Sequence, residues 1–145
     1  NPEYKEIELI MAANGRAKEK YLRMQGMDYN NYGLLYDHLD VALVPLRNNM
    51  FNNCKSPLKL IEAGIKGCAV IASDIQPYNV FPKSTYYPVP TYDNKKGWYK
   101  AIKTLNKEKR MREDLASNLS EYVSKEYDVK EWALTRYQLY LNLLK

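Results

Sequence analysis

Residues 51–73 read Phe-Asn-Asn-Cys-Lys-Ser-Pro-Leu-Lys-Leu-Ile-Glu-Ala-Gly-Ile-Lys-Gly-Cys-Ala-Val-Ile-Ala-Ser, and they decide how the fold is interpreted. Ser56 is a favourable N-cap, Pro57 suits the first position of a helix, and Gly67 suits the residue that ends one. Cys68–Ala72 is apolar throughout, which is typical of a strand buried on both faces. The stretch therefore predicts a helix that leads directly into a buried strand.

Positive charge lies at the unfavourable end of this predicted helix, Pro57–Lys66. Lys55 precedes the N-cap and Lys59 lies in the first turn. Both ammonium groups oppose the positive pole of the helix dipole, an effect of about 0.3–1 kcal/mol each at an exposed site. A phosphate bound at the helix N-terminus would make the same amides and lysines an anion site. The alternative is that both lysines are solvated and that Lys59, Glu62 and Lys66 form surface pairs at helical spacing.

Length and composition set the outer limits of the function. At 145 residues and 46% hydrophobic content, the chain is long enough to form one globular domain, residues 1–145, with a buried core. No run approaches the roughly 20 apolar residues of a membrane helix. The N-terminus has neither a signal-peptide hydrophobic region nor an initiator Met. We therefore expect a piece of a longer protein.

Cysteine and histidine usage disfavours several kinds of catalysis. Cys54 and Cys68 are too few for a disulfide scaffold and lack the Cys-x-x-Cys spacing of a zinc site, so a cytoplasmic, reducing compartment is expected. We expect Cys54 to be a small buried apolar residue rather than a nucleophile. His38 is the only histidine, and the sequence has no His-Glu-x-x-His or Ser-His-Asp set. Metal-dependent hydrolysis and triad chemistry are therefore not expected.

The net charge of +5 comes in part from a basic cluster between Lys95 and Arg112. Such a cluster is most often the solvated face of a helix, and less often a peripheral contact with an anionic membrane surface. No DNA- or RNA-binding motif accompanies it, so nucleic acid is not an expected partner.

In the first half of the chain, apolar strands alternate with helices. Glu6–Ala13 predicts a strand, Arg16–Gln25 a helix, and Asn31–His38 a shorter helix with Leu35 and Leu39 on one face. Four apolar residues, Val-Ala-Leu-Val, then form a strand that ends at Pro45. Strands without polar alternation are typical of a parallel sheet with helices on both faces. The expected fold class is therefore α/β.

The second half of the chain is mainly helical. Residues 75–94 are rich in Pro and Tyr and predict a loop with one short edge strand over Tyr86–Val89. Helical spacing of apolar residues also predicts that Leu58, Ile61 and Ile65 face the core. Three further helices are predicted, over Asn94–Leu105, over Lys107–Lys125 and from Asp128 onward, where Asp-x-x-Glu forms a capping-box pattern.

Four motifs together carry a family resemblance. They are Asp40-Val-Ala-Leu-Val-Pro-Leu, Lys55-Ser56-x-x-Lys59-x-x-Glu62-Ala63, Gly67-x-Ala-Val-Ile-Ala-Ser73-Asp, and Tyr127-Asp128 followed by Trp132-Ala133. In order and spacing they resemble the donor-binding C-terminal domain of GT-B glycosyltransferases, close to the bacterial polysaccharide and lipopolysaccharide transferases. The resemblance implies a Rossmann-like parallel sheet, with a helical C-terminal tail, that binds a nucleotide-diphosphate sugar at the carboxyl ends of its strands.

The resemblance also implies roles for particular residues. Lys55, with Ser56, Lys59 and the helix amides, would neutralise the donor diphosphate without a metal or other cofactor and would stabilise the departing group. Glu62 would accept hydrogen bonds from the ribose hydroxyls. Further donor contacts are expected from Leu58, from Cys54 and from Arg47 in the loop after the first buried strand.

Two features depart from the family pattern. Cys54 stands where related enzymes commonly carry a glutamate that contacts the transferred sugar, so the sugar and the stereochemical outcome stay open. The acceptor-binding N-terminal domain and the first strand-helix unit are expected to lie outside the chain, which should then bind donor weakly and transfer nothing. Two alternatives remain: a non-catalytic Rossmann-like interaction module, and a related enzyme such as a nucleotide-sugar epimerase.

Overall fold

The structure is a computed structural model that describes Asp28 and residues 30–144. Contacts divide the chain into two units, Asn1–Tyr32 and Gly33–Lys145. In the described part of the first unit, Asp28 accepts hydrogen bonds from the backbone N–H of Asn31 through its carbonyl and its carboxylate, which forms a turn. The strand and helix predicted over residues 6–13 and 16–25 lie outside the described residues.

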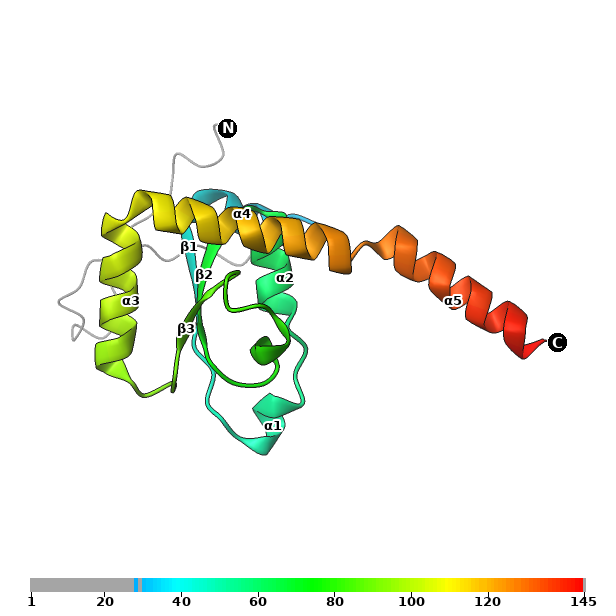
Figure 1. Ribbon diagram of the computed structural model, residues 1–145, viewed down its shortest axis with the longest axis horizontal. Coiled ribbons are helices and arrows are strands. Elements are labelled where there is room, and N and C mark those ends of the chain that lie inside the picture. Colours follow the sequence, from blue (N-terminus) through cyan, green and yellow to red (C-terminus); the bar gives the residue numbers. More distant parts are fainter. Residues whose placement is uncertain (1–27, 29, 145) are drawn as a thin grey trace. The chain divides into compact units, whose positions relative to one another are not determined.

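A parallel sheet forms the centre of the second unit (Figure 1). Its strands are β1 (Val41–Val44), β2 (Ala69–Ser73) and β3 (Tyr87–Val89), arranged in the order β1-β2-β3. Both pairs are parallel, with Val41 opposite Ala69 and Ile71 opposite Tyr87. Every residue of β2 is buried, as its apolar sequence predicts. The parallel α/β sheet and the short strand at its edge are therefore confirmed.

Helices precede, connect and follow the strands. The 3₁₀ helices are η2 (Tyr32–His38) and η3 (Tyr78–Val80), and the α-helices are α1 (Met50–Asn53), α2 (Leu58–Ile65), α3 (Lys95–Lys107), α4 (Lys109–Glu126) and α5 (Val129–Leu143). The predicted helices after residue 30 are thus all present, although η2 buries Tyr36 rather than Leu35 or Leu39. No helix in the part of the chain that the structure describes is long and apolar enough to cross a membrane.

The sheet has one apolar core on each face, because successive strand side chains point to opposite sides. On one face, Val70 packs with Leu60 of α2 and with Leu119 of α4. On the other, Ile71 packs with Leu105 of α3 and Leu115 of α4. α4 therefore contributes to both cores, and the three-layer order of helix, sheet and helix follows from the apolar strands.

The buried side of α2 differs from the prediction. Leu58 and Ile65 are exposed, and the buried residues are instead Leu60, Ala63 and Gly64. The reason is that α2 contacts α4 as well as the sheet. A Cβ atom on Gly64 would lie 2.8 Å from Val123 Cγ2, so only glycine allows this close approach of the two helices.

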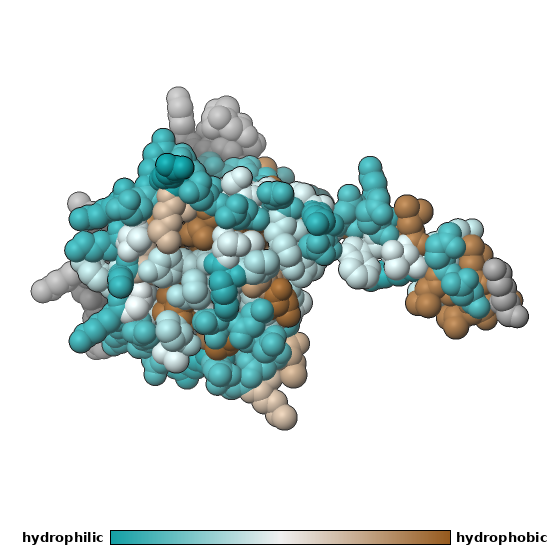
Figure 2. All heavy atoms as spheres, viewed as in Figure 1, coloured by the Kyte–Doolittle hydropathy of each residue, from teal (hydrophilic) through white to brown (hydrophobic). Residues whose placement is uncertain are grey.

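α5 packs differently from α4, the helix that precedes it. Asp128 caps it as expected, through a hydrogen bond of 2.7 Å from the Lys130 N–H to the Asp128 carboxylate. No residue of α5 is buried, and apolar side chains such as Trp132 and Leu143 are exposed. Figure 2 shows this apolar surface over the C-terminal part of α5. Helix formation here rests on the cap and on local propensity rather than on core contacts.

Candidate functional site

The carboxyl ends of the three strands are tied together by hydrogen bonds. The fully buried Ser73, at the end of β2, accepts a bond of 2.9 Å on its Oγ from the backbone N–H of Leu46, which follows β1. The N–H of Asp74 donates to the carbonyl of Val89, at the end of β3, at 2.8 Å. Ligands of parallel α/β sheets bind at this edge. The loops that begin here are therefore the first candidates for a site.

The loop after β1 is held by asparagine side chains. Asn49 Oδ1 caps α1 by accepting from the N–H of Asn52 at 2.8 Å, and the buried Asn52 side chain donates to the Arg47 carbonyl at 2.8 Å. The guanidinium of Arg47 lies 5.1 Å from the ring centroid of Tyr92, a residue of the loop after β3. Arg47 thus comes from the expected crevice loop, and the structure brings it against a partner, Tyr92, that no sequence motif indicated.

The N-terminus of α2 follows this loop and α1 in the chain. Its N-cap is Pro57, which makes no side-chain cap hydrogen bond, so the expectation that Ser56 is the N-cap is wrong. Pro57 adopts φ −79° and ψ 25°, and its carbonyl accepts from the N–H of Leu60 and of Ile61, which leaves Ser56 exposed outside the helix. The amides of the first turn therefore have no capping side chain among the described residues.

Two lysines flank this uncapped helix end. Lys55 is exposed, and its Nζ lies 4.9 Å from the ring centroid of Phe51, an exposed residue of α1. Lys59 is exposed in the first turn. No acidic residue lies in that turn. The local charge is therefore positive where the helix dipole is also positive.

Glu62 lies one turn further along α2 and makes two hydrogen bonds. Its Oε2 accepts from Lys59 Nζ at 2.9 Å, which is also an ion pair, and from the hydroxyl of Tyr36 at 2.7 Å. The pair with Lys59 is the surface contact expected from helical spacing. The contact with Tyr36 joins residues 26 positions apart, so no local pattern in the sequence could have indicated it.

The remaining predicted donor contacts lie on exposed surface. Cys54 is the exposed C-cap of α1, so the expectation that it is a buried apolar residue is wrong. Leu58 is 50% exposed at the start of α2. Together with Ser56, both are available to a ligand at the carboxyl edge of the sheet.

The loop between β2 and β3 carries a polar cluster that the sequence did not indicate. Lys83 donates to the carboxylate of Asp74 and, at 2.5 Å, to the hydroxyl of Tyr86. Burial raises the pKa of the Tyr86 phenol, and the nearby Lys83 ammonium opposes that rise. Burial alone would lower the pKa of Lys83, but its hydrogen bonds to Asp74 and Tyr86 outweigh that effect and raise it. The cluster fixes the loop that begins at the end of β2.

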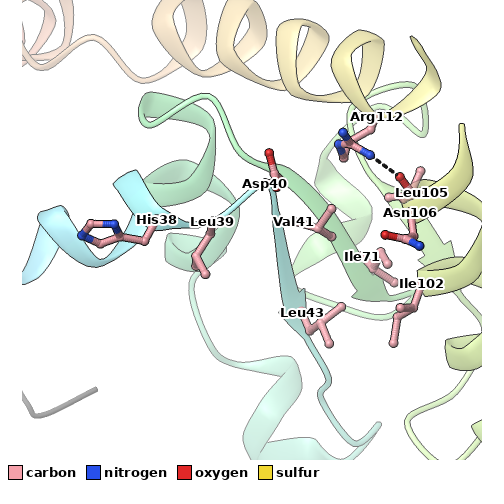
Figure 3. A pocket seen from close by; sticks show the side chains of 10 residues that line it. All are labelled: His38, Leu39, Asp40, Val41, Leu43, Ile71, Ile102, Leu105, Asn106 and Arg112. Atoms are coloured by element: carbon pink, nitrogen blue, oxygen red, sulfur yellow. Dashed lines mark hydrogen bonds between the residues drawn. The ribbon is translucent and has the colours of Figure 1, made fainter. Parts of the chain in front are cut away.

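A cavity of about 420 Å³ lies at the other end of the sheet (Figure 3). Its wall includes His38, Asp40 and Val41 at the amino end of β1, together with Leu105 and Arg112 near the α3–α4 junction. The Arg112 guanidinium donates to the Leu105 carbonyl at 2.6 Å, across this corner. None of the predicted donor residues lines the cavity, and it lies away from the edge where ligands of such sheets bind.

Comparison with known proteins supports one type of domain. No family model and no curated protein sequence matches the chain. Among solved structures, it is similar to sucrose-phosphate synthase from Thermosynechococcus elongatus, a GT-B glycosyltransferase, with a TM-score of 0.68 and 25% sequence identity. The match covers 83% of this chain and 29% of that chain, so this chain spans less than a third of the neighbour's length.

The similarity confirms the expected fold class and supports a glycosyltransferase-type domain. It does not extend to the bacterial polysaccharide transferases in particular. The roles of Lys55, Ser56, Lys59 and Glu62 stay predictions, as do the single-domain organisation and the absence of a metal.

Proposed function

We propose that this chain is the donor-binding domain of a glycosyltransferase that takes its sugar from a nucleotide-diphosphate sugar. The observation that carries the proposal is the uncapped N-terminus of α2, flanked by Lys55 and Lys59, at the ligand-binding edge of a parallel sheet. The similarity to a GT-B glycosyltransferase supports it. Bacterial surface polysaccharide or lipopolysaccharide synthesis is the pathway class that we propose for the whole protein.

The diphosphate is the part of the donor that this helix end suits best. The first-turn amides, which no side chain caps, and the Lys55 ammonium supply positive potential, and Lys59 adds to it although it pairs with Glu62 of the next turn. A diphosphate bound there would receive charge-assisted hydrogen bonds, which are stronger than bonds between neutral groups. Neither a metal nor another cofactor is needed to compensate its charge.

The proposed chemistry places Lys55 beside the leaving group. As the bond between the anomeric carbon and the diphosphate oxygen breaks, the sugar becomes oxocarbenium-like and negative charge grows on the diphosphate. Preorganised positive groups stabilise that charge more in the transition state than in the ground state. Lys55 and the α2 amides would supply this effect, and a partner domain of the same protein would supply the acceptor.

The other donor contacts follow from the same pose. Glu62 would accept hydrogen bonds from the ribose hydroxyls, one turn away from the phosphates. Arg47 and Leu58 would border the nucleotide, and Cys54 and Ser56 would lie close to the diphosphate. For Arg47, the cation–π contact with Tyr92 supports a fixed position at the mouth of the site.

A cytoplasmic location, with peripheral contact to the inner face of a membrane, is also proposed. The support is the sequence of α3, which has five lysines and no acidic residue. Polybasic segments of this kind are attracted to anionic lipid by roughly 1 kcal/mol per lysine near the surface. Sedimentation with vesicles of anionic lipid, compared with neutral vesicles, tests this part of the proposal.

Titration of the 145-residue chain with nucleoside diphosphates, followed by NMR, tests the proposal directly. We expect shifts of the backbone amides from Lys55 to Glu62 with uridine, adenosine or guanosine diphosphate, and none with the matching free nucleosides. If no diphosphate binds, a non-catalytic interaction module is the better description. Detection of epimerisation rather than transfer by a longer form of the protein would instead favour the nucleotide-sugar epimerase.

A further inference from the structure

Tyr36 makes a contact that neither the sequence motifs nor the proposed donor site includes. Its hydroxyl donates a hydrogen bond of 2.7 Å to Oε2 of Glu62. The Tyr36 side chain comes from η2, before β1, and only 8% of the residue is exposed. It packs in the same core cluster as Leu60 and Ala63 of α2. Its ring is therefore fixed by packing, and its hydroxyl is held at the carboxylate of Glu62.

The hydrogen bonds to Glu62 fall on one oxygen only. Lys59 Nζ donates to the same Oε2 at 2.9 Å, so this oxygen has two donors. No hydrogen bond from the described residues to Oε1 is present. Two donors on one oxygen fix the plane of a carboxylate, and they leave the second oxygen as the open acceptor. The Glu62 side chain is 22% exposed, so the carboxylate is not closed off from solvent.

We propose that Tyr36 is a positioning residue for the nucleotide: it fixes Oε2 of Glu62 so that Oε1 accepts the hydrogen bonds of the ribose diol. This inference rests on the proposed function, because it assigns a purpose to the orientation of Glu62 in the same site. Preorganisation of a polar group raises ligand affinity because the cost of ordering that group is met before binding.

A purely structural role for the Tyr36 hydroxyl is the alternative. Two other contacts already join this segment to its neighbours: Lys66 of α2 pairs with Asp37 at 2.7 Å, and the Cys68 thiol donates to the backbone carbonyls of Tyr36 and Leu39. Neither contact involves the Tyr36 hydroxyl. Replacing Tyr36 with Phe therefore keeps the ring and both attachments, and removes the hydroxyl that donates to Glu62.

The test compares each nucleoside diphosphate with its 2′,3′-dideoxy analogue, which lacks the diol. Uridine, adenosine and guanosine diphosphate are first ranked on the wild-type chain, and the pair for the tightest binder is used. For Tyr36→Phe we expect the affinity for the diphosphate with the diol to fall about three- to ten-fold, the effect of one weakened hydrogen bond. The affinity for the dideoxy analogue should not change, because Glu62 has nothing to bind there.

Tyr122→Phe is the matched control. Tyr122 packs against the same core cluster, but its hydroxyl donates to the Val80 carbonyl and not to Glu62. We expect this variant to bind both ligands as the wild type does. It separates the loss of a hydroxyl in this core from the loss of the bond to Glu62.

Each other outcome overturns the inference. If Tyr36→Phe binds both ligands as tightly as the wild type, its hydroxyl does not orient Glu62 for the diol. If the affinities for both ligands fall equally, the hydroxyl only stabilises the fold. A variant that fails to fold leads to the same conclusion, that the role of the hydroxyl is structural. If the wild-type chain itself binds neither ligand, the proposed function fails and the positioning role fails with it.

Discussion

The two ends of α2 differ in how their backbone groups are hydrogen-bonded: the C-terminal end is capped and the N-terminal end is not. At the C-terminal end, the N–H of Cys68 donates to the Ala63 carbonyl and the N–H of Gly67 to the Gly64 carbonyl, and Gly67 has a φ of +68°. These bonds form a Schellman motif, which accounts for the last carbonyls of the helix. At the N-terminal end no side chain caps the helix, and the nearby charges are positive.

This difference separates residues that stabilise the fold, at the C-terminal end of α2, from residues that we expect to bind a ligand, at its N-terminal end. A helix end that is complete within the protein stabilises the fold, and the C-terminal end of α2 also packs directly on α4 through Gly64. The N-terminal end has no capping side chain, and an end that breaks such a local rule is where a ligand is expected. Substitutions at the C-terminal end should therefore change the free energy of unfolding, and substitutions at the N-terminal end should change ligand affinity.

The largest expected effect is on stability, where α4 covers the C-terminal half of α2. Leu119 is fully buried against Gly64, so Leu119→Ala should lower the free energy of unfolding by about 2–5 kcal/mol through lost burial and a cavity. Denaturant unfolding followed by circular dichroism measures this loss. Leu134→Ala on α5, where the side chain is 59% exposed, is the control and should change stability by less than about 0.5 kcal/mol.

The sequence predicted this end of α2 well but not its packing. Gly67 and the buried strand that follows it are local signals, so the end of the helix and β2 could be predicted from them. The residues that α2 buries could not be predicted from local signals, because Gly64 faces residues of α4 that lie more than fifty positions later in the chain. Helical spacing of large apolar residues favoured Leu58 and Ile65, whereas the close approach of two helices needs small residues such as Ala63 and Gly64.

The second expected effect is on ligand binding at the N-terminal end. Lys55→Ala and Lys59→Ala should each weaken nucleoside-diphosphate binding by about 1–3 kcal/mol, as for the loss of a hydrogen bond to a charged group. Isothermal titration measures the affinity. Stability should not fall for Lys55→Ala, because a charge that opposes the helix dipole has been removed.

Lys125→Ala, at the far end of α4, is the control and should leave the affinity unchanged. Unchanged affinity in both variants of the site would remove the basis for the anion site.

Next in size is the backbone effect at Gly67. The left-handed conformation costs a residue with a Cβ atom about 1–2 kcal/mol. Gly67→Ala should therefore lower the free energy of unfolding by about that amount, although no atom lies within 4 Å of the new Cβ. Gly33→Ala is the matched control: its φ is not positive, and its new Cβ would lie 3.5 Å from the end of the Lys66 side chain, an ordinary contact. Equal changes in the two variants would mean that the Schellman motif does not stabilise this end of α2.

The candidate site could be predicted only in part. Lys55, Lys59 and Glu62 lie in one short segment, so their proximity follows from the sequence, and the alternation of strands and helices predicts the edge at which they lie. Ser56 was expected to cap the helix because Ser is a favourable N-cap, but Pro57 takes that position. The contacts of Tyr36 with Glu62 and of Arg47 with Tyr92 depend on the tertiary fold, so no local pattern could indicate them.

The smallest expected effect on stability is at Glu62, which lies between the two ends of α2. Glu62→Gln keeps the shape of the side chain and an oxygen that can accept from Tyr36, but it removes the charge that pairs with Lys59. The loss of this partly exposed pair should cost about 0.3–0.5 kcal/mol of unfolding free energy. Glu113→Gln on α4, which removes an exposed pair with Lys109, is the control and should cost no more than this.

The same Glu62→Gln substitution separates the two ligand contacts of the site. Binding of a nucleoside diphosphate should weaken several-fold, because an amide oxygen is a poorer acceptor for the ribose diol than a carboxylate. Binding of inorganic pyrophosphate, which has no diol, should stay at its original level or strengthen, because a negative charge near the phosphates has been removed. Titration calorimetry with both ligands measures the two affinities on one protein sample. If both ligands weaken equally, or neither changes, Glu62 does not contact the ribose, and α2 then contributes to binding only through its N-terminal end.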